Sequence, residues 1–183
     1  VATNHSDHWE RSINTADALR LSHKALKLLE SEELVGTWMG NIVAKGVGFF
    51  RESNNLLAVV ERFLQSESGG DNTVRISQAQ IEDHLQQEGY LPQGASLDDI
   101  ATGSSSFGEA ANKINQFQAL VLKTGFRFGK LEGQQGNGLS NNDFQNSIKS
   151  IFIGSREAIR DNLVSYMKSM VQKNDDGAFA LAN

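Results

Sequence analysis

Residues 133–144 read Gly-Gln-Gln-Gly-Asn-Gly-Leu-Ser-Asn-Asn-Asp-Phe, and within this stretch the sequence changes from an open loop to the start of a helix. The Ser140 side chain is placed to accept a hydrogen bond from the backbone N–H three residues later. The Asp143 side chain is placed to accept one in return from the Ser140 backbone N–H, as in a capping box. The Asp143 carboxylate would also complement the helix dipole. We therefore predict a helix that begins at Ser140.

Two more pairs have the spacing of a capping box: Ser77 with Gln80, and Ser106 with Glu109. Each pair predicts the start of a helix. Between and beyond these caps, apolar residues recur at spacings of three, four and seven, which is the pattern of a helix with one buried face. The apolar residues of the expected helices fall within residues 12–30, 34–50, 56–64, 77–87, 106–128, 144–152 and 159–170.

The buried faces follow from the same spacing. In the first helix we expect the apolar face to consist of Ile13, Ala16, Leu19, Leu26 and Leu29. In the helix that begins after Ser106, the longest of the set, it consists of Ile114, Phe117, Val121, Thr124 and Phe128.

Composition agrees with a helical fold. The 183 residues include a single proline, Pro92, so long windows remain in which a helix can propagate. No segment alternates with period two for long enough to predict a sheet, although residues 74–76 could pair briefly. The prediction is an all-α fold, an irregular bundle of six or seven helices with two long loops.

The chain is interpreted as a single helical domain, residues 1–183, because its length matches one ordinary core. Residues 89–106 are the candidate sub-boundary, since they contain Pro92, Gly94, Gly103 and three consecutive serines. The chain begins with Val1 instead of Met. We therefore expect either a processed chain or a fragment of a longer one.

The charge argues against a dedicated nucleic-acid binder. The net charge is −5 at pH 7 and neither half of the chain has a surplus of basic residues, whereas phosphate binding requires one. There is no cysteine, so disulfides and thiolate metal sites are excluded. No cofactor is predicted.

The candidate chemical sites are sparse. His5, Asp7 and His8 are ligand types for zinc or copper, but they stand near a terminus without a second ligand cluster, so a solvated tail is the preferred interpretation. His23 and His84 lack an identifiable catalytic partner. No catalytic, cofactor-binding or metal site is therefore assigned.

The segment Leu34–Phe50 has two interpretations. Gly36 and Gly40 allow close packing, and Trp38, Phe49 and Phe50 are aromatics suited to a membrane interface. The segment is at the short limit for spanning a bilayer, so a buried core helix is preferred over membrane contact.

A resemblance supplies a functional expectation. Leu120–Lys123, followed by Gly136–Phe144 and then Ile148 and Ile151, resembles a pattern in large structural proteins of tailed bacteriophages. There a helix is followed by a glycine-containing turn that leads into Leu-Ser-x-x-Asp, and then by another helix. The resemblance covers residues 120–151. It implies a protein packaged inside the particle, attached near the portal, or ejected with the genome.

The expected function is therefore that of a non-enzymatic structural component of a tailed-phage virion, which acts through helix packing with other virion proteins or with itself. Virion localisation follows if the resemblance holds, and a cytoplasmic protein otherwise. Large aromatics dominate interfaces when they lie outside a core. The interface candidates are Trp38, Phe49, Phe50, Phe126 and Phe128.

Two alternatives remain from other classes. A membrane-active or pore-forming helical protein would act through Leu34–Phe50. A hydrolase such as a peptidoglycan-degrading enzyme would need two positioned carboxylates, for example Glu109 or Glu132 with a partner across a cleft. The sequence gives no reason to pair them.

Overall fold

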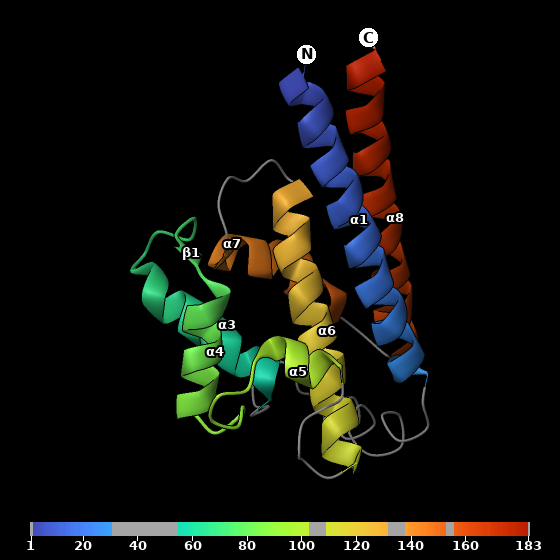
Figure 1. Ribbon diagram of the computed structural model, residues 1–183. Coiled ribbons are helices and arrows are strands. Elements are labelled where there is room, and N and C mark those ends of the chain that lie inside the picture. The colour runs from blue at the N-terminus through green and yellow to red at the C-terminus, as the bar shows by residue number, and fades with distance from the viewer. Residues whose placement is uncertain (1, 31–54, 103–108, 132–137, 153–155, 183) are drawn as a thin grey trace.

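The computed structural model describes residues 2–30, 55–102, 109–131, 138–152 and 156–182 (Figure 1). This part of the chain confirms the all-α prediction, with seven α-helices and one two-stranded ribbon. In chain order the elements are α1 (Ala2–Leu29), α3 (Leu56–Ser68), β1 (Arg75–Ile76), α4 (Gln78–Gln87), α5 (Leu97–Ala101), α6 (Glu109–Leu131), β2 (Leu139–Ser140), α7 (Asn141–Asp143), a π-helix (Phe144–Ile148), a 3₁₀-helix (Lys149–Phe152) and α8 (Arg156–Ala182).

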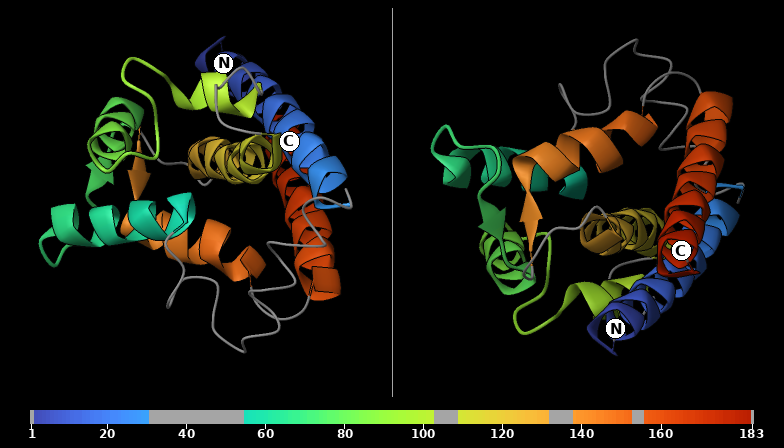
Figure 2. Two further views of the ribbon diagram at one scale, coloured as in Figure 1. Left: turned by 90° about the horizontal axis from the view of Figure 1, so that it is seen from below. Right: turned by 90° about the horizontal axis from the view of Figure 1, so that it is seen from above.

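Helix α6 is the centre of the fold. Figure 2 shows it end-on with the other elements around it, and it contacts α1, α3, α5, α8, β2 and the π-helix. Residues 117–122 are all buried, so the middle of the helix has no solvent face. A helix enclosed on every side must be apolar around its whole circumference, and this segment, Phe-Gln-Ala-Leu-Val-Leu, is apolar except at Gln118.

The exception at position 118 has a structural role. Gln118 is 1% exposed, and its Oε1 accepts a hydrogen bond from the backbone N–H of Leu57 at 3.1 Å. Leu57 lies in the first turn of α3, where backbone N–H groups have no partner within the helix. Asn55 caps the same helix, because its Oδ1 accepts from Ala58 N at 2.9 Å. Two backbone N–H groups at the N-terminus of α3 thus have buried side-chain acceptors.

The two short strands join distant parts of the chain. β1 and β2 pair antiparallel, with Arg75 opposite Ser140 and Ile76 opposite Leu139. Gly138 precedes β2 with φ +141°, and a β-carbon there would lie 2.8 Å from the Ile76 carbonyl oxygen. Only glycine permits this close approach without strain. The sequence indicated brief pairing at residues 74–76 but gave no partner for it.

The segment after β2 changes helix type twice. Its 3₁₀-helix packs on α6 through Phe152, whose ring meets the Phe117 ring edge-on with centroids 6.0 Å apart. Towards α3, the segment is held by an ion pair between Lys149 Nζ and Glu61 Oε2 at 2.9 Å. The Gln145 side chain donates to the same Glu61 oxygen at 2.9 Å.

The candidate sub-boundary at 89–106 is described as far as Thr102. Leu91, Leu97 and Ile100 from this region are buried in the same apolar core cluster as the residues of α6. Helix α5 contacts α6 directly, and the Gln116 side chain donates to the Ala101 carbonyl oxygen at 2.9 Å.

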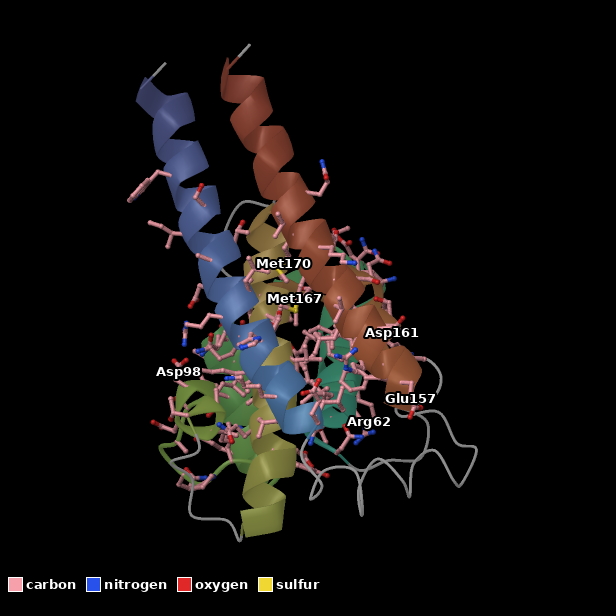
Figure 3. All side chains as sticks on the ribbon, turned by 90° about the vertical axis from the view of Figure 1, so that its right-hand side faces the viewer. Arg62, Asp98, Glu157, Asp161, Met167 and Met170 are labelled. Carbon is pink, nitrogen blue, oxygen red and sulfur yellow. The ribbon has the colours of Figure 1, made fainter. Side chains whose placement is uncertain are left out.

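Helices α1 and α8 form a long antiparallel pair along one side of the molecule. In Figures 1 and 3 they run side by side, and the ends marked N and C in Figure 1 both project beyond the rest of the fold. At the other end of the pair, Arg160 Nε lies 3.2 Å from Glu30 Oε1. Met170 is fully buried on α8 and Met167 is half-buried (Figure 3).

Two predictions for the first helix were wrong. The helix begins at Ala2, ten residues before the predicted start at Ser12, so His5 and His8 belong to a helix and not to a tail. Ile13 and Ala16, which were assigned to its buried face, are exposed. Leu29 is buried and Leu26 packs against the core, as predicted, but the rest of the buried face is formed by Thr15, Ala18, Leu21, Ser22 and Ala25.

Candidate interaction surface

The predicted interface aromatics do not gather on one surface of the described structure. Trp38, Phe49 and Phe50 lie outside the described residues, as does the side chain of Phe128. Phe126 is half-buried and packs against the core. The structure therefore offers no surface made from these five residues together.

The predicted caps can be located in part. Ser77 precedes α4, accepts from Gln80 N at 3.2 Å and donates its own backbone N–H to Gln80 Oε1 at 3.1 Å. Ser140 precedes α7 and accepts from Asp143 N at 3.1 Å. Ser106 lies outside the described residues. Ser77 and Ser140 thus each cap the start of a helix.

The surface that the structure does present lies on α1. Thr15, Ala18, Ser22, Ala25 and Leu29 form its inner stripe, at spacings of three and four residues, and all are buried. At 100° per residue, the opposite side of the helix carries a second stripe with the same kind of spacing. This outer stripe consists of Trp9, Ile13, Ala16, Arg20, His23 and Lys27, and every member is exposed.

The first half of the outer stripe is apolar. Trp9 is 69% exposed and Ile13 is 53% exposed, and Ala16 follows them on the same face. Among the described residues, these are the two most exposed of the large hydrophobic side chains. Tryptophan supplies a large contact area with few rotatable bonds, and for that reason it is enriched at the centres of protein interfaces.

The second half of the outer stripe is basic. Arg20, His23 and Lys27 are exposed, and Lys24 is exposed beside them. Asp17 partly neutralises this half, because its Oδ1 lies 2.6 Å from Arg20 Nη2. Both groups of this pair are exposed to solvent to some degree, so the pair contributes little to stability and can exchange partners. This half of the stripe is therefore a local basic surface on a chain whose net charge is −5.

Helix α8 carries one further exposed apolar residue. Val171 is 41% exposed and lies one residue beyond the buried Met170. Glu157 and Asp161 are exposed near the start of the same helix (Figure 3). At the other end of the pair, the end of α1 marked N and the end of α8 marked C project beyond the rest of the fold (Figure 1).

The part of the chain that the structure describes contains no group of three histidine, aspartate or glutamate residues able to hold a metal ion. The carboxylates named for a hydrolase, Glu109 and Glu132, have side chains outside the described set, so that alternative is not tested.

Asp71 has its pKa lowered, because the Thr73 hydroxyl and then the Thr73 backbone N–H donate to its carboxylate. Asp71 and Thr73 lie in an exposed turn before β1, away from α1.

The membrane interpretation of Leu34–Phe50 falls on residues outside the described part of the chain. Of the helices that are described, none has both the length and the apolar character required to cross a membrane.

Comparison with known proteins does not extend this description: no family model matches the sequence, and no curated protein or solved structure shows significant similarity to the chain.

The sequence interpretation missed the outer stripe because it assigned Ile13 and Ala16 to the core. A signal was nevertheless present. Two sets of residues spaced by three and four run along α1 half a turn apart, and the inner set is made of small residues and leucine. Only packing decides which of the two stripes faces the core, and packing against α6 and α8 selected the one with smaller side chains.

Proposed function

We propose that this chain is a non-enzymatic structural protein that works by packing helices against other proteins, as a component of a tailed-phage virion. The observation that carries the proposal is the exposure of Trp9 and Ile13 on the outer stripe of α1. Both side chains stand on a helix that already uses its opposite face to build the core, so more than half of each lies outside the packing of the described structure.

Covering these side chains would be favourable. Burial of apolar surface contributes roughly 25 cal/mol per Å², and an aromatic side chain offers on the order of 200 Å². Isolated exposed hydrophobic residues are common on protein surfaces. Here, however, two large ones stand one helical turn apart on the same face, with Ala16 continuing the stripe. This arrangement supports a helix-packing interface.

The virion assignment rests on the resemblance of residues 120–151 to tailed-phage structural proteins. Three features of this segment support the proposal: it contains a long helix, α6, then a glycine at Gly138, and then Ser140, which caps the start of the next helix, α7. A projecting pair of helix ends is a suitable feature for a component that joins neighbouring proteins in a particle.

The proposal is tested by peptide mass spectrometry on sedimented particles and on the soluble fraction from the native source. A structural component is expected to sediment with the particles at a fixed copy ratio to the major particle protein. Recovery of the chain only as a free soluble protein would overturn the virion role and would direct attention to vesicle-leakage and peptidoglycan-hydrolysis assays.

A further inference from the structure

The outer stripe of α1 is divided along its length, and this division defines the partner it fits. Trp9, Ile13 and Ala16 form its apolar half, and Arg20, His23 and Lys27 form its basic half. We propose that the outer stripe docks an acidic amphipathic helix of another protein, which lies antiparallel to α1. This inference rests on the proposed function, since it specifies the partner through which a helix-packing component would act.

Charge argues against a second copy of this chain as the partner. A parallel pairing of two outer stripes would set Arg20 against Arg20 and Lys27 against Lys27, and like charges at facing positions are destabilising. An antiparallel pairing over the full stripe would set Trp9 against Lys27 of the other copy. A shorter antiparallel overlap would join only the apolar halves. The area buried by three side chains from each copy would fall far below the roughly 800 Å² per partner of a stable interface.

The surface also fits a helix better than it fits a nucleic acid or a membrane. Binding to phosphates needs a surplus of basic residues, whereas half of this stripe is apolar and the chain is acidic overall. A helix that lies on a membrane needs a wide apolar face. The apolar face that α1 does have, with Ala18, Leu21, Ala25 and Leu29, is already buried in the core.

The required partner has a definable pattern. Its contacting residues repeat at spacings of three and four, with apolar side chains opposite Trp9 and Ile13 and carboxylates opposite Arg20 and Lys27. In the antiparallel orientation, the carboxylates fall in the N-terminal half of the partner helix, where the helix dipole favours negative charge. The exposed Lys24 would strengthen the same contact from the flank.

The test is site-specific photo-cross-linking in the full chain, expressed in its native source. A benzoylphenylalanine group replaces Ala16, at the junction of the two halves, and in a matched control it replaces Ala79, which is exposed on α4. Thermal unfolding of both variants establishes that each is folded. The expected result is a cross-link from position 16, absent from position 79, to a helical segment with apolar residues and Asp or Glu in the stated order.

A second variant tests the charge. Lys27→Glu in the position-16 cross-linking chain is expected to reduce the adduct several-fold, and replacement of the facing acid in the partner by Lys is expected to restore it. An adduct to a second copy of the chain, to nucleic acid or to lipid would overturn the inference, and so would a yield at position 16 no higher than at position 79.

The two proposals fail in different ways. An adduct with an acidic helix in the soluble fraction, with no chain in particles, would preserve this inference and remove the virion role. The chain sedimenting with particles but giving no specific adduct at position 16 would preserve the virion role and remove this inference.

Discussion

Gly125 in α6 lies directly against Ile148 of the π-helix. A β-carbon built at Gly125 would meet the Ile148 Cδ1 atom and would lie 2.8 Å from its Cγ1 atom. Both residues are buried. Glycine at this position is therefore what allows the segment after β2 to approach the central helix.

Gly125→Ala should lower the free energy of unfolding because of this close approach. Overpacking of a core costs about 1–3 kcal/mol, and the better helix propensity of alanine returns roughly 1 kcal/mol. We expect a net loss of about 1 kcal/mol in the free energy of unfolding, measured in urea. In an Ile148→Val background, which removes the Cδ1 atom, the same change should cost less. Equal costs in both backgrounds would show that these residues do not meet.

Lys149→Met should destabilise the fold through Glu61. The Glu61 side chain is 9% exposed and would lose its cation, whereas the Lys149 side chain is 39% exposed, so solvent screens part of the loss. We expect a decrease of about 1–2 kcal/mol in the free energy of unfolding at pH 7. Lys168→Met on the exposed side of α8 is the control and should change little. The further change Glu61→Gln should recover part of the loss.

Asn55→Ala should cost more than Ser77→Ala. Asn55 is a 7% exposed N-cap of α3, and its removal leaves the Ala58 N–H without its acceptor inside the core. A loss of about 1–2 kcal/mol is expected. Ser77→Ala keeps the bond from its own backbone N–H to Gln80 Oε1, so a loss of about 0.5 kcal/mol is expected. Thermal unfolding of the two variants gives the comparison, and the reverse order would contradict it.

Asp71 should titrate below its ordinary pKa of 3.8. The Thr73 hydroxyl donates to Asp71 Oδ1 at 2.6 Å, and the Thr73 backbone N–H donates to the same atom at 3.0 Å. Because the folded-state pKa is lowered, the stabilisation by this carboxylate is present above the unfolded-state pKa and is lost as the pH falls through the folded-state value.

Carboxyl NMR titration of Asp71 provides the measurement. Thr73→Val removes the hydroxyl donor and keeps the backbone donor, so the midpoint should move part of the way back towards 3.8. A midpoint at or above 3.8 in the unchanged chain would contradict the turn geometry.

Local signals in the sequence predicted much of this fold. Single-proline composition and apolar spacing predicted the all-α class, and Ser77 with Gln80 marked the start of α4. The face of α6 that carries Phe117, Val121 and Thr124 is also buried as expected. In each case the signal, a cap or an apolar spacing, can be read within a short stretch of sequence.

Long-range packing determined what the sequence could not predict. Nothing near Arg75 identifies its partner strand, because Ser140 lies far along the chain and also serves as a helix cap. The π-helix after Asp143 has no local sequence signal of its own. The two opposed stripes of α1 are both compatible with burial, and the choice between Ile13 and Ala18 depended on which face met α6 and α8.

The measurement that tests the central claim most directly compares particle incorporation of three chains: the unchanged protein, Trp9→Ala, and Val74→Ala as an exposed apolar control. Val74 is 38% exposed and lies before β1, away from α1. Both changes should alter the free energy of unfolding by less than about 0.5 kcal/mol, because they remove exposed side chains. Quantitative mass spectrometry of sedimented particles should then find Trp9→Ala depleted several-fold and the other two chains at the same copy ratio. Trp9→Ala at the ratio of the unchanged protein, or none of the three chains in particles, would contradict the account.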